Sequence, residues 1–433
     1  MCGGISRPSA TLLSMSTRVA FFHGMTPIEI EFPNLGTYTR EYLDEHPEEM
    51  QRLLRQCKGQ YPRCLCRTPS LPLYIAQRGK YYLARLPNSG PDHAPACPSY
   101  EPDAAQCGWG IYTPKALEER GDGYIRLRLA APLTIRGSTG AGPTVVAGRV
   151  SAECTQRDAM GLRGLLHLLW ERSEFNRWRP AMAGRRRYKQ VYKYLLEAAE
   201  LVSLRRENLT RHLFMPEPFD STQRLQIEAR RQRALAERSA TAAGAPTRVL
   251  VAGQLRGIVP LENTVQGINL AHAPRELLIR TTPVLLARLR QETEFAWLDW
   301  PSLYSQFRLI VLFTMQRSRQ GHWSIDELTG MVTTLEYIPV LSMEEALLAQ
   351  HLIHQSRFFI KPLPYDAAAA RLPNFLLVDC GAAAVPLEIV GYDATDAATR
   401  RSRIAQYLVN GVPHWSWDFR DQHLPPDLPQ LVI

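Results

Sequence analysis

Cys64-Leu-Cys66 is followed, 26 residues later, by His93-Ala-Pro-Ala-Cys97, and these two motifs set our expectation for the N-terminal part of the 433-residue chain. A CxC pair holds two thiols on one tight loop, and an HxxxC pair can supply the other two ligands of a tetrahedral Zn²⁺. Apolar residues at 74–86 between the motifs indicate a hairpin that brings them together. We therefore predict a structural zinc that folds a segment too small for its own core. The predicted ligands are Cys64, Cys66, His93 and Cys97.

Cysteine usage supports a metal over disulfides. Five of the eight cysteines lie between positions 57 and 107, and clustered cysteines in a reducing compartment are first read as metal ligands. Cys57 or Cys107 could replace one of the four ligands, and the cysteines could instead be reduced thiols in a small core. A catalytic zinc is disfavoured, because no general base lies nearby in the sequence.

Composition indicates a globular protein. Hydrophobic residues make up 45% of the chain and charged residues 21%, and no apolar run approaches the ~20 residues that span a bilayer. The stretch 1–22 lacks a charged start followed by a clean hydrophobic core, so we expect no signal peptide. These features predict a cytoplasmic protein that has no membrane partner.

Positive charge is concentrated in the middle of the chain. The formal net charge is +9, and residues 156–238 hold 18 Lys and Arg against 10 Asp and Glu. Two helical patterns flank a basic connection there, as in helix-turn-helix modules, and arginine makes bidentate contacts to phosphate. We expect a nucleic-acid surface, for DNA more than for RNA, although a solvated arginine-rich helical face is the alternative. The residues assigned to it are Arg177, Arg179, Arg185, Arg186, Arg187 and Lys189.

The C-terminal part alternates helix and strand patterns. We expect helices over 300–317 and 324–334, and a helix over 342–356 that begins with a capping-box signal at Ser342. Strands at 358–363, 375–379 and 385–390 and a helix at 399–408 follow. The predicted fold class is α+β multidomain. Its expected parts are a zinc-bearing β-rich domain at 20–150, a basic helical module at 151–240 and an α/β domain at 247–433, with a small-residue linker at 239–247.

The order helix, three strands, helix resembles the core of PD-(D/E)XK nucleases, in which carboxylates hold Mg²⁺ for phosphodiester cleavage. That resemblance implies Glu344 as the first-helix acid, Asn374 where an Asp would stand, and Glu388 as the second acid. Asp379 could replace Asn374 only if a bulge re-aims it. Val390 stands where the lysine would be, so positive charge would have to come from Lys361, Arg400, Arg401 or Arg403, and Glu345 is explained as the capping-box residue. Asn374 in place of the Asp and Val390 in place of the lysine are two departures from the nuclease pattern. They favour a degenerate nuclease-like domain or an unrelated α/β domain over a working enzyme.

Several motifs together resemble an uncharacterised family, the domain of unknown function numbered 1173. They include the two cysteine motifs, Leu165-Leu-His-Leu-Leu-Trp170, Met215-Pro-Glu-Pro-Phe219 and Arg357-Phe-Phe-Ile-Lys-Pro-Leu363, and the resemblance covers roughly residues 20–420. It implies a bacterial protein of mobile genetic elements and no established activity or active site.

Three functions remain open from the sequence. The first is a zinc-stabilised nucleic-acid-binding protein of a conjugative element or plasmid. The second is a metal-dependent nuclease, or a degenerate relative, that uses Mg²⁺ and Glu388. The third is a non-enzymatic scaffold that binds a protein partner. Serine hydrolases are disfavoured, because the sequence contains no GxSxG motif.

Overall fold

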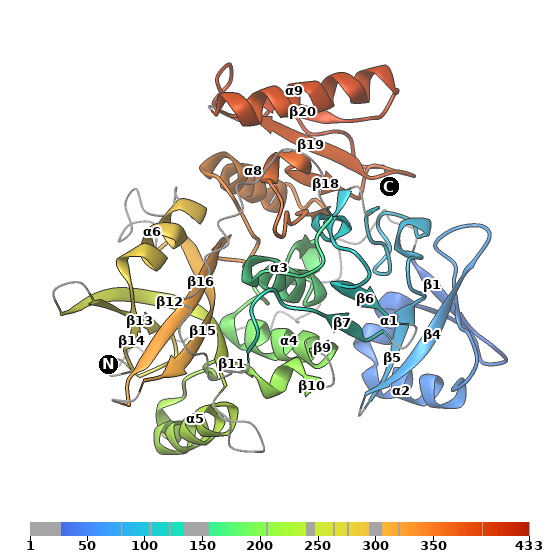
Figure 1. Cartoon of the computed structure of the whole chain (residues 1–433). Coiled ribbons are helices and arrows are strands. Elements are labelled where there is room, and N and C mark those ends of the chain that lie inside the picture. The colour runs from blue at the N-terminus through green and yellow to red at the C-terminus, as the bar shows by residue number, and fades with distance from the viewer. Residues whose placement is uncertain are drawn as a thin grey trace, which may run out of the picture.

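A computed structural model of the chain describes residues 27–432, apart from 79, 104–105, 121–122, 134–155, 205–206, 240–246, 263–264, 275–276, 294–304, 319–320 and 392. The expected absence of a signal peptide, the expected linker and the first part of the expected helix at 300–317 lie outside these residues. None of the described helices is both long and apolar enough to cross a membrane. The mixed α and β content is confirmed (Figure 1).

The N-terminal sheet is antiparallel and has two short helices beside it. Its hairpin of β4 and β5 confirms the one expected between the cysteine motifs. The sequence favours one helix over 42–56, but Pro47 occupies the first turn of α2, and the chain therefore forms two helices that meet at His46. The elements are β1 (Glu29–Phe32), β2 (Gly36–Thr39), α1 (Arg40–Glu45), α2 (Pro47–Gln56), β3 (Arg63–Cys64), β4 (Leu71–Arg78) and β5 (Lys80–Arg85).

The middle of the chain contributes three longer helices, and the first two carry the expected helical patterns. The connection between the first two, residues 173–187, is longer than the tight turn of a helix-turn-helix, and it contains β8. A small sheet, in the order β10-β9-β7-β6, completes this part. The elements are β6 (Leu117–Glu119), β7 (Ile125–Leu127), α3 (Leu162–Arg172), β8 (Arg177–Trp178), α4 (Tyr188–Glu200), β9 (Val202–Leu204), β10 (Glu207–Asn208), β11 (Leu213–Phe214) and α5 (Arg224–Arg238).

A closed five-stranded barrel follows. β12 pairs with β13 through its second half and with β15 through its first half, and the register shifts between Leu255 and Gly257. β14 lies parallel to β16, so the order runs 12-13-14-16-15 and returns to 12. This order, with a helix between the third and fourth strands, is the connectivity of the OB-fold. The elements are β12 (Val249–Glu262), β13 (Val265–Leu270), β14 (Ile279–Thr281), α6 (Pro283–Glu292), β15 (Phe307–Arg317) and β16 (Trp323–Thr334).

Two expected helices are wrong at this point, because 307–317 and 323–334 are the longest strand pair of the barrel. Leu309, Val311 and Phe313 point into the barrel core. Ile310 and Leu312 point outward and are covered by α3 and α4. Because both faces of the strand are buried, its sequence is a continuous apolar run without the alternation that marks a half-exposed strand.

The C-terminal part forms a sheet in the order β20-β19-β18-β17-β8. Neighbours among β8, β17, β18 and β19 are antiparallel, and β20 returns parallel to β19 after α9. Ser342 caps α8 through the Glu345 amide, as expected. The expected strands at 358–363, 375–379 and 385–390 and the helix at 399–408 are present, with shifted ends. The elements are α8 (Met343–His354), β17 (Phe359–Ile360), β18 (Phe375–Leu377), β19 (Val385–Val390), α9 (Ala394–Val409) and β20 (Trp415–Asp418).

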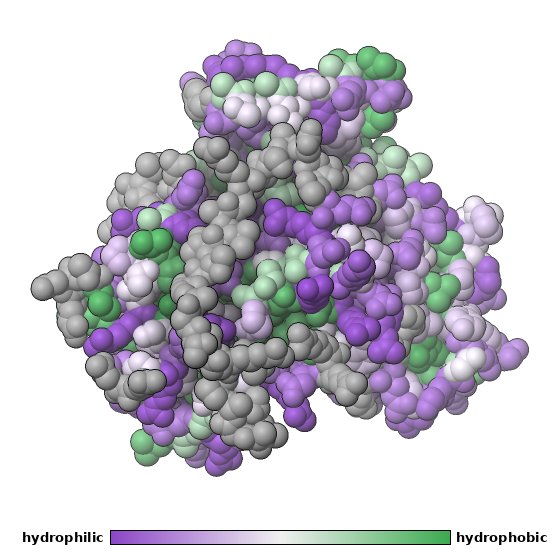
Figure 2. Space-filling model, viewed as in Figure 1, coloured by the Kyte–Doolittle hydropathy of each residue, from purple (hydrophilic) through white to green (hydrophobic). Residues whose placement is uncertain are grey.

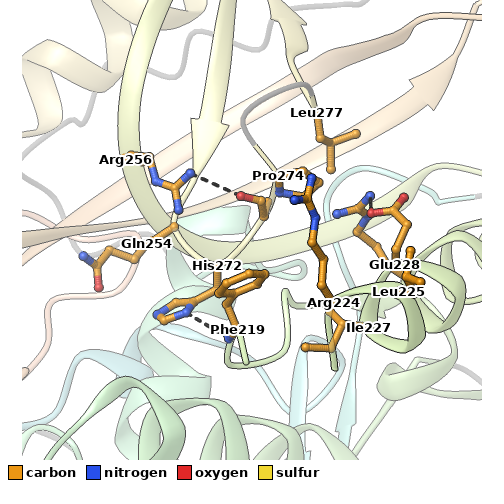
Figure 3. A pocket seen from close by; sticks show the side chains of 13 residues that line it. Phe219, Arg224, Leu225, Ile227, Glu228, Gln254, Arg256, His272, Pro274 and Leu277 are labelled. Carbon is orange, nitrogen blue, oxygen red and sulfur yellow. Dashed lines mark hydrogen bonds and ion pairs between the residues drawn. The ribbon is translucent and has the colours of Figure 1, made fainter. Parts of the chain in front are cut away.

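Shared strands and cores join these parts. The segment 151–240 gives β8 to the C-terminal sheet and β11 to the barrel. Phe359 and Phe375 belong to the core that the C-terminal sheet shares with the barrel, whereas Ile360 and Leu376 face the N-terminal sheet. Figure 2 shows one face of the molecule, on which hydrophilic residues surround several smaller apolar patches. A pocket opens between α5 and the barrel (Figure 3).

Candidate metal centre and nucleic-acid surface

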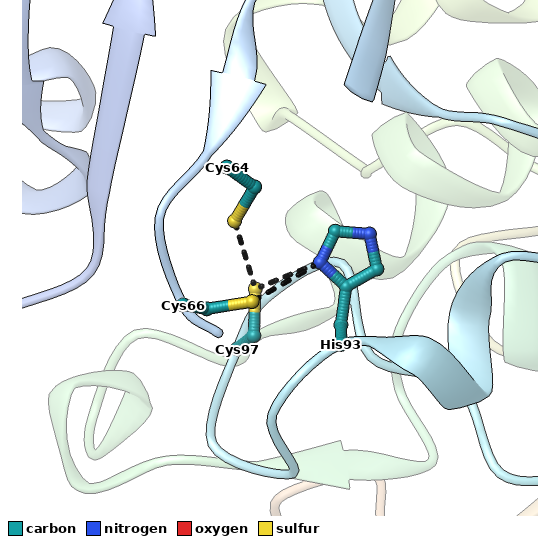
Figure 4. Close-up of side chains that lie close together, drawn as sticks. All are labelled: Cys64, Cys66, His93 and Cys97. Carbon is teal, nitrogen blue, oxygen red and sulfur yellow. Dashed lines mark hydrogen bonds between the residues drawn. The ribbon is translucent and has the colours of Figure 1, made fainter. Parts of the chain in front are cut away.

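The structure brings all four predicted metal ligands together (Figure 4). Cys64 lies on β3 and Cys66 just after it, while His93 and Cys97 lie on the loop that follows β5. One ligand atom from each residue lies within 4.8 Å of the other three. The four could therefore bind a metal such as zinc.

The distances fit a tetrahedral ion. Two sulfurs on a zinc with ~2.3 Å bonds lie ~3.8 Å apart. Sγ of Cys64 is 3.7 Å from Sγ of Cys97, and Nδ1 of His93 lies 3.3 Å from Sγ of Cys66 and 3.7 Å from Sγ of Cys97. The backbone amides of Ala94 and Ser99 donate to Cys66 and Cys97, as suits thiolates.

Burial indicates a closed site. Cys64, His93 and Cys97 are at most 1% exposed, and Cys66 is half-buried. Nε2 of His93 is buried without a hydrogen-bond partner among the described residues, so the ring presents only Nδ1 to its neighbours. A closed set of four ligands is typical of structural rather than catalytic zinc.

The thiol pKa values in the cluster shift in opposite directions, since hydrogen bonds with Cys66 and Cys97 raise the pKa of Cys64 well above its usual range. Hydrogen bonds with Cys64, Cys97 and His93 hold the pKa of the Cys66 thiol well below its usual range. Burial alone would lower the pKa of His93, but its hydrogen bonds with Cys66 and Cys97 outweigh burial and raise it to about 9. Thiolate is the form that binds metals.

Cys57 and Cys107 lie outside this cluster. The Cys57 thiol donates to the carbonyl of Pro33, and the Cys107 thiol donates to the carbonyl of Pro102. Burial raises the pKa of both thiols, so both are held in the neutral form. Neither replaces one of the four ligands.

The acids expected from the nuclease resemblance converge only in part. Glu388 is fully buried, and its carboxylate accepts from Arg403 at 2.6 and 2.7 Å and from Arg400 at 3.1 Å. Asn374 lies beside it, because its Oδ1 accepts from the same Arg400 at 2.6 Å. These two residues, 14 positions apart, therefore meet around one guanidinium.

Glu345, for which the sequence indicates only a capping role, completes this network. Its Oε1 accepts from Lys361 at 2.6 Å and from Asn374 at 2.7 Å, and its Oε2 accepts from the Leu341 amide at 2.7 Å. Burial lowers the pKa of Lys361, which Glu345 opposes. Lys361 lies in a stretch of otherwise apolar residues, and a charged residue there needs a buried partner. This is the sequence signal that could have identified the pair of Lys361 and Glu345.

Glu344 and Asp379 lie elsewhere. Glu344 is half-buried on α8 and makes no ion pair with any described residue. Asp379 is buried in a bidentate pair with Arg357, at 2.8 and 3.0 Å, and it also accepts from the Phe358 amide. No bulge re-aims it toward Asn374.

Charge in the network is already balanced. Glu345, Glu388 and Asp396 are opposed by Lys361, Arg400 and Arg403. A guanidinium sits between Glu388 and Asn374, where a shared Mg²⁺ would have to lie, and buried carboxylates with paired cations have little remaining affinity for an ion. The cluster is suited to holding α8 and α9 against the sheet.

The six basic residues of the expected nucleic-acid surface divide into two groups. Arg186 packs on Phe175 and Trp178, and its guanidinium donates to the carbonyls of Glu174, Phe175, Arg177 and Glu336. Burial lowers the pKa of Arg186 to about 10. Arg186 thus braces the surrounding backbone and is half-buried like Arg177 and Arg179, while Arg185, Arg187 and Lys189 are exposed.

The comparisons with known proteins concern nearly the whole chain. A model of a family described as a protein of unknown function matches residues 38–419. No curated protein and no solved structure matches the chain.

Proposed function

Since the chain belongs to the DUF1173 family, which is described only as a protein of unknown function, we propose a function from its own geometry: it binds nucleic acid, and a zinc ion folds its N-terminal part. DNA is the favoured ligand, and a role for a bacterial mobile element remains our interpretation of the family resemblance. The observation that carries the proposal is the barrel of β12–β16.

OB-type barrels bind oligonucleotides on the outer face of their early strands. Here the outer face of β15 and of the first half of β12 is covered by α3 and α4, while the middle of β12 and the loop that follows β13 line the pocket beside α5. Since a fold alone does not establish an activity, the charges near this open face matter.

Exposed cations lie next to the open face of the barrel. Arg185, Arg187 and Lys189 flank Tyr188, whose ring stacks on His272 at the pocket, and they make no ion pair with any described residue. Arg224 on α5 is likewise exposed. Each cation that neutralises a phosphate releases counterions, so such a surface gives affinity that falls with salt.

When bound, zinc would join the four ligands in a tetrahedron, and the surrounding side chains supply the packing. Cys64 and Cys97 belong to the core that packs the N-terminal sheet against β17 and β18. Tying β3 to the loop after β5 therefore stabilises the side of the molecule opposite the barrel core. We do not extend the proposal to nuclease activity, because the acids concerned are neutralised by Lys361, Arg400 and Arg403.

The test is fluorescence anisotropy with labelled duplex DNA, oligothymidylate and oligouridylate over a range of salt concentrations. We expect binding whose logarithm falls linearly with the logarithm of salt. Changing Arg185, Arg187 and Lys189 together to Ala should weaken binding and reduce the slope by about 2.

The matched control removes the same charge from the N-terminal part, on α2, just after it and on β5. Arg55, Lys58 and Lys80 are exposed there, and their change to Ala should leave affinity and slope as in the wild type. Negligible affinity for all three probes at low salt would overturn the proposed function.

A further inference from the structure

The pocket beside the barrel has a volume of about 1020 Å³, which exceeds the size of many small-molecule sites. Three parts of the chain line it. They are the segment at the start of α5, the middle of β12, and the loop that joins β13 to β14. It therefore lies beside the first strand of the barrel and the loop between its second and third strands.

Positive charge predominates in the pocket. Arg224, Arg231 and Arg256 line it with one acid, Glu228, which pairs with Arg231. Arg256 is held by Asn269 Oδ1 at 3.3 Å and by the carbonyl of Ala273 at 3.2 Å. Figure 3 shows the guanidinium groups of Arg224 and Arg256 both reaching toward the loop that carries Pro274. Two cations are thus left to meet an anionic ligand such as a phosphate.

His272 is held in an unusual conformation at the pocket wall. Its φ is +63°, a left-handed value that costs a non-glycine residue roughly 1 kcal/mol. Its ring stacks on Tyr188, with centroids 4.0 Å apart and planes at 20°. Nδ1 accepts from the amide of Phe219 at 3.1 Å, so the proton of the neutral ring is on Nε2. The strained backbone of His272 therefore accompanies a fixed ring whose Nε2 is a hydrogen-bond donor.

Burial and the charge of Arg256 lower the pKa of His272, which keeps the ring neutral at pH 7. Its partner ring is also fixed, because the Tyr188 hydroxyl donates to the carbonyl of Pro216 at 2.6 Å. The His272 ring in the pocket wall is therefore held in place by the Tyr188 ring that stacks on it.

The motif Met215-Pro-Glu-Pro-Phe219 organises this wall. Pro216 anchors Tyr188, Glu217 pairs with Arg230 of α5 at 2.7 Å, and the Phe219 amide orients His272. The Phe219 side chain, which these contacts leave free, is 52% exposed at the pocket. An exposed aromatic ring beside arginines is the combination on which unstacked bases bind.

We propose that this pocket binds one nucleotide unit of single-stranded nucleic acid, with the base on Phe219 and near Nε2 of His272, and the phosphates at Arg224 and Arg256. The inference rests on the proposed function and deepens it. A duplex keeps its bases stacked and paired, so only a single strand can place a base in the pocket while its backbone continues along the exposed cations.

The experiment measures anisotropy of a labelled oligothymidylate of about twenty nucleotides, with an unlabelled DNA hairpin as competitor. Phe219→Ala should lower affinity about tenfold or more, because stacking on one aromatic ring is lost. Arg224→Ala should reduce the salt slope by about 0.7. Both side chains are exposed, and the Phe219 backbone amide is retained, so folding should be preserved.

Matched controls separate the pocket from the general surface. Arg233 is exposed on the same helix outside the pocket, and Leu424 is an apolar side chain 74% exposed at the C-terminus. Arg233→Ala and Leu424→Ala should bind like the wild type. If the wild type binds nucleic acid and both pocket variants match these controls, the pocket proposal is overturned while the proposed function stands. Absence of wild-type binding would overturn both.

Discussion

Glu388 illustrates at the residue scale how a catalytic residue type can be used for stability. Its position in a strand of otherwise apolar residues suggests a metal ligand, because a carboxylate is rarely buried without a purpose. Both of its oxygens are engaged by Arg400 and Arg403 from one helix, and Tyr407 donates to Oε1 at 3.3 Å. A buried charge needs a partner, and here the partner is a guanidinium where the resemblance implied Mg²⁺.

Glu388→Gln should destabilise the protein by about 3 kcal/mol, because buried Arg400 and half-buried Arg403 would lose the negative charge that opposes them. Urea unfolding measures the change. Asp418→Asn is the control, since Asp418 pairs with Arg401 and Arg420 at the surface and should cost below about 1 kcal/mol. Equal losses in the two variants would contradict a supporting role for the buried network.

Cys97→Ser should abolish zinc binding, because the variant lacks one of the four ligands and three seldom hold structural zinc. Elemental analysis of the purified protein should give about one zinc per chain for the wild type and none for the variant. Cys380→Ser is the control, since Cys380 lies beside Asp379 and away from the cluster. Equal zinc contents in wild type and Cys97→Ser would refute the assignment.

Helices and strands that bury only one face can be predicted from the sequence. Those that bury both faces are predicted poorly. The hairpin of β4 and β5 and helices α4, α8 and α9 follow amphipathic patterns or capping signals. The helices expected in place of β15 and β16 are wrong, because the two buried faces of these strands leave no alternation. The covering of the second face by α3 and α4 is a long-range contact that a local pattern does not contain.

Helix α3 gives the pH prediction. It buries His167, whose Nδ1 accepts from the Tyr365 amide at 2.9 Å, as a satisfied core histidine. Burial, with Arg163 and Lys361 nearby, holds the pKa of His167 well below its ordinary value. Below about pH 6.5 the unfolded chain binds a proton at this histidine that the folded chain does not, so stability falls as pH falls.

The measurement is the free energy of unfolding in urea at about pH 7.5 and about pH 5.5. Wild type should lose roughly 1 kcal/mol more than His167→Gln between these values, because glutamine can accept the same hydrogen bond without titrating. The same loss in both proteins would show that His167 does not drive the acid sensitivity.

At the scale of the whole molecule, remote segments meet backbone to backbone. A Cβ on Gly108 would lie well inside contact distance of the Leu363 carbonyl oxygen, and 2.7 Å from the carbonyl carbon of Pro364. Asp366 in the same segment accepts from Tyr112 at 2.5 Å and from the Gly161 amide at 2.7 Å. The loop after β17 therefore ties together parts of the chain that lie far apart in sequence.

Gly108→Ala should destabilise the protein by roughly 2 kcal/mol, since the opposing backbone cannot rotate away as a side chain could. Thermal or urea unfolding measures the loss. Gly391→Ala serves as the control, because no described atom lies within 4 Å of the position that its methyl carbon would take, and the change should be nearly neutral. A neutral Gly108→Ala would contradict the close approach.

The amino-acid sequence on its own determined the four residues that cluster as candidate metal ligands, the basic middle segment, the capped helix α8 and the family. These depend on residue type and on spacing within a few turns or one hairpin, where the geometry is local. Only the tertiary structure decided that β12–β16 close into a barrel, that Arg186 donates to backbone carbonyls, and that Glu388 is neutralised by Arg400 and Arg403. Strand pairing and charge compensation depend on which distant segments pack together. A charged side chain that is open to solvent can bind a ligand, whereas the same side chain covered by its own chain stabilises the fold.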